Sequence, residues 1–106
     1  MTMNITCAII DDEPLALELL ENYVSRVPFL KLTGKYTSAI EALARIKEDG
    51  TQLLFLDIQM PDLNGLEFSR IIDRSTKVVF TTAFSEYAIE SYRSQALDYL
   101  LKPINF

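Results

Sequence analysis

The chain has 106 residues, of which 49% are hydrophobic and 24% charged, and its formal net charge is −5. This size and composition predict one soluble domain. Because no apolar run approaches the ~20 residues of a membrane-spanning helix, we expect a cytoplasmic protein without membrane contact. The net negative charge argues against direct nucleic-acid binding, which needs a surface with clustered basic side chains. The lack of histidine excludes Ser-His and Cys-His catalysis and histidine-based zinc sites.

The first elements alternate between strand and helix. Residues 5–10 form an apolar run that predicts a buried strand, and Cys7 within it is expected to be an inert, buried thiol. Pro14 favours the first turn of a helix. Apolar residues at helical spacing continue that helix until Pro28 marks its end. Residues 29–36 then alternate partly between apolar and charged side chains, which is typical of a strand at the edge of a sheet.

The alternation continues to the end of the chain. A second helix is predicted after Ser38, which fits a capping box with Glu41, and Gly50 closes that helix. Residues 53–56 are continuously apolar, as expected for a central strand covered on both faces. A loop rich in turn-forming residues follows at 61–65. The remaining predicted elements are a helix at 66–73, a strand at 78–82, a helix at 85–94 and a strand at 96–101.

Strands and helices in this order predict an α/β fold, a doubly wound five-stranded parallel sheet with helices on both faces. We expect residues 1–106 to form a single domain that stops before its last helix, the C-terminal fifth helix being missing. An apolar sheet face is unfavourable in water. We therefore expect either reduced stability or an oligomer that covers this face, which would be a homodimer or a swapped oligomer.

Acidic side chains follow two of the predicted strands. Asp11 and Asp12 end the first run, Asp57 ends the central run, and Lys102 follows the last one. Because parallel strands bring their carboxyl ends to one edge, these residues should converge there. Mg²⁺ prefers oxygen ligands and takes one or two carboxylates. We expect Asp12 and Asp57 to bind it directly, Asp11 to hold a metal-bound water, and the backbone carbonyl of Gln59 to contribute.

The same cluster suggests phosphoryl chemistry. Asp57 is a candidate nucleophile for phosphorus. The cation and the Lys102 ammonium would stabilise charge on the equatorial oxygens, and the Thr82 hydroxyl would donate to them. Each residue also has a purely structural alternative. Asp11 and Asp12 are also suited to capping the following helix, Asp57 to a turn, Thr82 to a β-branched strand, Lys102 to a solvated surface and Tyr99 to packing.

At this point the sequence resembles the receiver domain of bacterial two-component response regulators, most of all the regulators with a LytTR-type output domain. The resemblance covers essentially the whole chain. It rests on residues 9–14, 56–65, 79–83 and 98–103, and for the LytTR-type subgroup on residues 81–88 and 96–104.

The resemblance implies a flavodoxin-like fold with strand order 2-1-3-4-5. It implies that Asp57 accepts a phosphoryl group from a sensor histidine kinase. It also implies that Asp11, Asp12 and Asp57 hold Mg²⁺. Thr82 would be the switch hydroxyl, Tyr99 the switch aromatic and Lys102 the phosphate partner. The output would be transcription through a DNA-binding domain outside this chain. The domain would be a signalling module, not an enzyme, although it assists its own phosphotransfer and dephosphorylation.

Two other functions remain open from the sequence. A phosphatase of the haloacid-dehalogenase type also uses a strand-end aspartate, but it needs a second acid two residues later, where this chain has Gln59. A degenerate receiver would act only as an interaction module. That function fits less well, because every residue expected for phosphorylation is present.

Overall fold

The computed structural model describes residues 4–57, 71–72, 76–82 and 98–101. Seven elements have defined bounds within these ranges. They are β1 (Ile5–Ile10), α1 (Pro14–Ser25), β2 (Leu30–Tyr36), α2 (Ala39–Asp49), β3 (Leu53–Asp57), β4 (Lys77–Thr82) and β5 (Asp98–Leu101). The helices expected at 66–73 and 85–94 lie largely or wholly outside the described residues.

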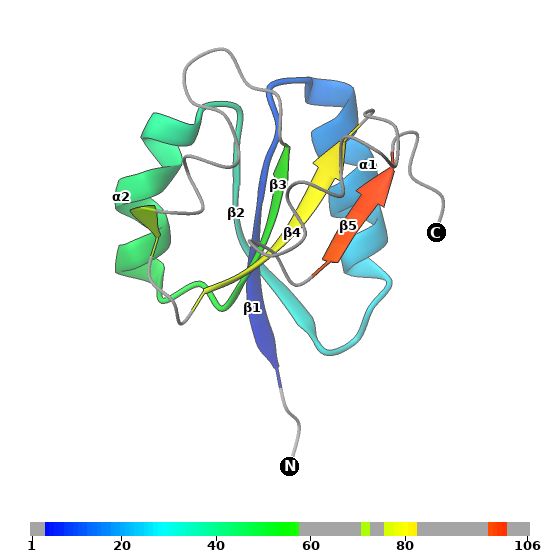
Figure 1. Ribbon diagram of the computed structural model, residues 1–106. Coiled ribbons are helices and arrows are strands. Elements are labelled where there is room, and N and C mark those ends of the chain that lie inside the picture. Colours follow the sequence, from blue (N-terminus) through cyan, green and yellow to red (C-terminus); the bar gives the residue numbers. More distant parts are fainter. Residues whose placement is uncertain (1–3, 58–70, 73–75, 83–97, 102–106) are drawn as a thin grey trace.

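All strand pairs in the sheet are parallel, and the strand order is β2-β1-β3-β4-β5. The two described helices lie on opposite faces of this sheet (Figure 1). The predicted α/β architecture with a parallel sheet is confirmed, and β2 lies at an edge, as its partly charged sequence indicated. In the described part of the chain, no helix has the length and apolar character needed to cross a membrane.

Local sequence signals fix both helices. Pro14 occupies the first turn of α1, where its missing N–H leaves no hydrogen bond unmade. At the start of α2, the Ser38 side chain accepts a hydrogen bond from the Glu41 backbone N–H at 3.4 Å. Gly50 ends α2 with a φ of 64°, a left-handed conformation that glycine adopts without steric penalty. The predicted boundaries of α2 are therefore confirmed at both ends.

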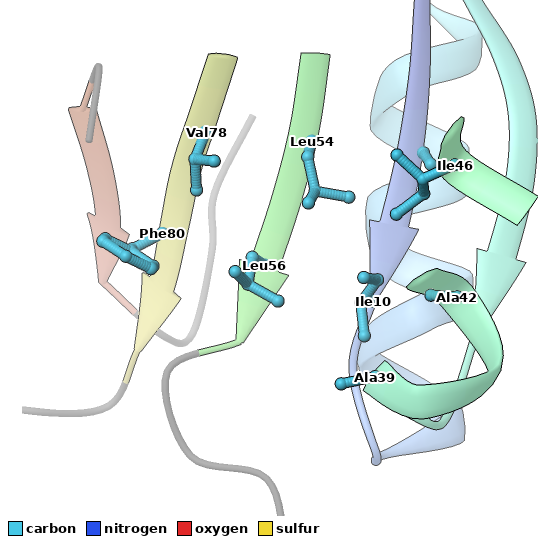
Figure 2. Packing of buried hydrophobic residues seen from close by; sticks show 9 residues of the cluster. Ile10, Ala39, Ala42, Ile46, Leu54, Leu56, Val78 and Phe80 are labelled. Carbon is cyan, nitrogen blue, oxygen red and sulfur yellow. The ribbon is translucent and has the colours of Figure 1, made fainter. Parts of the chain in front are cut away.

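The sheet separates two hydrophobic cores. On the α2 side, β1, β3 and β4 present alternate side chains to the helix (Figure 2). The labelled members of that core are Ile10, Ala39, Ala42, Ile46, Leu54, Leu56, Val78 and Phe80. On the α1 side, Cys7 and Ile9 pack against Leu17, Leu20 and Val24. Because the central strands are covered on both faces, their ends are held in fixed register.

The edge strand β2 contains one irregularity. Its pairing with β1 shifts between Cys7 and Ala8, which pair with Leu32 and Gly34, so that Thr33 is an inserted residue. The Thr33 hydroxyl donates to the Cys7 carbonyl at 3.0 Å and lies 3.3 Å from the Thr51 hydroxyl. The inserted residue is therefore tied to β1 and to the segment before β3, as expected for a specified bulge.

Candidate functional site

Three carboxylates meet at the carboxyl edge of the sheet. Ile10 pairs with Leu56 across β1 and β3, so the residues that follow them start from adjacent positions. Asp11 and Asp12 come directly after β1, and Asp57 is the last residue of β3. One oxygen from each of the three carboxylates lies within 4.8 Å of the other two. The convergence inferred from parallel strand ends is therefore present in the structure.

The three acids differ in their exposure. Asp11 is fully buried and Asp57 is 4% exposed, whereas Asp12 is exposed. Asp11 Oδ1 accepts a hydrogen bond from the Glu13 backbone N–H at 3.0 Å, which fixes its carboxylate at the entry to α1. Buried carboxylates this close together repel one another, and such a cluster is stabilised by a cation.

The capping alternative for these acids is correct only in part. Glu13 is the N-cap residue of α1 and makes no side-chain capping hydrogen bond. Asp11 does bond to the backbone at the entry to the helix, but its second oxygen is also buried. Asp12 is exposed beside it. The arrangement therefore leaves carboxylate oxygens from both acids directed to the cluster with Asp57.

The donor set fits a hard divalent cation. All three candidate ligands are carboxylate oxygens, two of the residues are buried, and one is open to solvent. Mg²⁺ takes such ligands while keeping waters and phosphate oxygens in its remaining positions. An exposed Asp12 beside buried Asp11 and Asp57 gives a site with access from solvent on one side. The roles of these residues as ligands stay a prediction.

Of the other expected site residues, one lies at the same edge, one lies earlier in β5, and two lie outside the described residues. Thr82 is the last residue of β4, and its backbone pairs with Leu101 of β5. Tyr99 pairs with Phe80 in the same ladder. Gln59 and Lys102 lie outside the described residues. The functional roles of all four residues, Thr82, Tyr99, Gln59 and Lys102, remain predictions.

Sequence reasoning missed one polar residue beside the cluster. Thr81 pairs in register with Asp57, and its side chain is fully buried. The sequence contains a signal for it, because two successive threonines end the fourth strand. The register that places Thr81 next to Asp57 comes only from the structure.

Comparison with known proteins identifies relatives over nearly the whole chain. Residues 7–106 match the family described as the response regulator receiver domain. A response regulatory protein of Shewanella oneidensis is 46% identical over 103 residues, covering 95% of this chain and 44% of that protein. The transcriptional regulatory protein BtsR of Escherichia coli is 41% identical over 99 residues, covering 92% and 41%. The chain thus spans less than half the length of these curated relatives.

Solved structures agree with this match. The receiver domain of the putative response regulator NarL from Mycobacterium tuberculosis superposes with a TM-score of 0.86 at 25% sequence identity. That alignment covers 97% of this chain and 87% of the other. The fold similarity is therefore not limited to the strongly matching motifs.

Proposed function

The chain belongs to the response regulator receiver domain family, and from that membership and its acid cluster we propose that it is a phosphorylation-activated signalling switch. Asp57 accepts the phosphoryl group. The observation that carries this proposal is the placement of the Asp11, Asp12 and Asp57 oxygens within 4.8 Å at the carboxyl edge of the sheet. Asp57 is 4% exposed, so its carboxylate is held in place and reacts only with a group that enters this edge.

Mg²⁺ is the proposed cofactor. Asp11, Asp12, Asp57 and the backbone carbonyl of Gln59 would hold it, and a bound cation supplies positive charge to the phosphoryl oxygens during transfer. Asp57 attacks the phosphorus, and the bond from phosphorus to its donor breaks. The Lys102 ammonium and the Thr82 hydroxyl bind the oxygens of the phosphoryl group. In this scheme the domain assists its own phosphotransfer and dephosphorylation without acting on an external substrate.

Phosphorylation changes the surface through a two-state switch. Thr82 moves toward the phosphoryl group, and Tyr99 takes the space that Thr82 leaves. The affected surface is the one formed by the fourth helix and the fifth strand. Such a shift requires that the phosphoryl group interact differently with the two states. The placement of Thr82 and Tyr99 on the paired strands β4 and β5 supports this coupling.

The proposed phosphoryl donor is a phosphohistidine on a sensor histidine kinase. The proposed output is transcription, as the name of the E. coli relative suggests, through a LytTR-type DNA-binding domain outside these residues. The receiver itself would not contact nucleic acid, which agrees with its net charge of −5. A homodimer or swapped oligomer remains a prediction for the isolated chain.

Intact-mass measurement tests the proposal. The protein is incubated with Mg²⁺ and phosphoramidate, a small phosphoryl donor, beside an Asp57→Asn control. A gain of one phosphoryl group in the parent alone is expected. A folded parent that gains none would favour the interaction module. Steady turnover of an added phosphomonoester, measured as released phosphate, would instead favour the phosphatase.

A further inference from the structure

A row of polar side chains crosses the sheet at the site edge. Asp57 and Thr81 are paired residues of β3 and β4, and Asp11 follows Ile10, which pairs with Leu56. Asp11 and Thr81 are fully buried, and Asp57 is 4% exposed. Three buried polar side chains in or directly after adjacent strands are unusual, because strand interiors are otherwise apolar.

The side chains in this row point to the same face. Ile10, Leu56 and Phe80 belong to the core on the α2 side of the sheet. Successive side chains of a strand alternate between faces, so the residue after each of these points toward the α1 side. Thr81 therefore lies next to Asp57 on the same face, at the ~4.8 Å spacing of neighbouring strands.

The Thr81 hydroxyl is a donor with an unmade bond. Its Oγ1 atom is buried and makes no hydrogen bond in the part of the chain that the structure describes. Buried hydroxyls are normally hydrogen-bonded, and an unbonded one is unfavourable. A carboxylate only accepts hydrogen bonds. The Asp57 carboxylate, in register on the neighbouring strand, is therefore the acceptor to which a small side-chain rotation would bring this hydroxyl.

We propose that Thr81 is a positioning residue for Asp57. When a cation binds the three carboxylates, the Asp57 carboxylate turns and accepts a hydrogen bond from the Thr81 hydroxyl. This hydrogen bond is absent in the cation-free protein and present in the cation-bound protein. Thr81 therefore destabilises the cation-free state relative to the cation-bound state. A group with different interactions in two states shifts the equilibrium between them. This inference rests on the cation site of the proposed function.

The test compares Mg²⁺ affinity, measured by isothermal titration calorimetry, in matched variants. Thr81→Val keeps the side-chain shape and removes the hydroxyl, and Thr81→Ser keeps the hydroxyl. In the absence of cation, we expect Thr81→Val to unfold at a higher temperature than the parent, because it has no unbonded buried hydroxyl. We expect it to bind Mg²⁺ roughly tenfold more weakly than the parent, which is the loss in affinity that corresponds to one hydrogen bond to a charged group. Thr81→Ser should bind Mg²⁺ like the parent. If Thr81→Val fails to fold, Thr81→Ala against Thr81→Ser gives the same comparison.

Thr76→Val is the control. The Thr76 hydroxyl donates to the Thr51 carbonyl at 2.8 Å, at the opposite end of β4. Its removal should lower the unfolding temperature and leave Mg²⁺ affinity unchanged. If the parent binds Mg²⁺ and gains a phosphoryl group, and Thr81→Val binds Mg²⁺ as tightly as the parent, the inference about Thr81 is overturned. The proposed function is not affected by that result. A parent that neither binds Mg²⁺ nor gains a phosphoryl group would overturn the proposed function as well.

Discussion

The acid cluster predicts that Asp57→Asn will stabilise the cation-free protein. The substitution keeps the side-chain shape and removes one of three carboxylates whose oxygens lie within 4.8 Å of one another. Two like-charge pairs are lost. Each pair at that distance repels by about 0.9 kcal/mol at the dielectric constant of water and by about 3.5 kcal/mol at an effective value near 20.

Solvent reaches the cluster through the exposed Asp12, so the lower part of this range applies. Two pairs near the value for water give a gain of roughly 2 kcal/mol in the free energy of unfolding. For a domain of about this size, each kcal/mol shifts the unfolding temperature by ~4–8 °C. We therefore expect Asp57→Asn to unfold about 8–16 °C above the parent at low salt and neutral pH.

Thermal unfolding by circular dichroism measures this shift in EDTA and again in Mg²⁺. In Mg²⁺ the difference should shrink or reverse, because the cation stabilises the parent through the charge that the variant lacks. Glu18→Gln removes the same charge from an exposed position on α1, away from the cluster, and should leave the unfolding temperature nearly unchanged. The reasoning would be refuted by an Asp57→Asn protein that unfolds at or below the parental temperature in EDTA.

Three further predictions concern the cores and the edge strand. Phe80 is 1% exposed in the α2-side core, so Phe80→Ala should lower the free energy of unfolding by about 3–5 kcal/mol in urea titrations. A Cβ atom at Gly34 would lie 2.7 Å from Cζ of Tyr36. Gly34→Ala should therefore destabilise the parent by about 1–3 kcal/mol and a Tyr36→Leu background by less, and equal losses would rule out this contact as the cause. Burial raises the pKa of the Cys7 thiol above its ordinary value of 9.0. The folded state therefore binds more protons above pH 9, and stability should fall as pH rises past 9, a slope that Cys7→Ala should lessen.

The sequence predicted the site edge well because its signals are local. The apolar runs before Asp11 and Asp57 are short and continuous, which predicts two buried strands. The carboxyl ends of parallel strands meet at one edge of the sheet whatever the conformation of the loops, so Asp11 and Asp57 come together there. Pro14, Ser38 and Gly50 define helix boundaries within one turn of themselves. Boundaries of strands moved by a residue or two. For example, β4 begins at Lys77, whose N–H donates to the Gln52 carbonyl, a partner 25 positions earlier in the chain.

What the sequence could not predict depends on register between distant segments. Thr81 and Thr82 are the same residue type at adjacent positions, and only the pairing of β3 with β4 shows that Thr81 lies beside Asp57. Thr33 resembles any β-branched strand residue. Its role as an inserted residue follows from bonds to Cys7 and Thr51, which lie 26 and 18 positions away in the chain.

The inserted Thr33 lets one edge strand serve both sides of the sheet. Leu30 and Leu32 pack in the core on the α1 side, whereas Tyr36 packs in the core on the α2 side. Strict two-residue alternation would put all three on one face. The extra residue changes the parity of the strand, and Lys35 thereby reaches Glu21 on α1 in an ion pair of 2.9 Å. Deleting Thr33 would place Gly34 directly after Leu32 and leave Lys35 and Tyr36 opposite Ile9 and Ile10, on the faces that they now occupy. A chain that lacks this one residue should therefore keep both cores and lose only the bulge and the bonds of the Thr33 hydroxyl to Cys7 and Thr51.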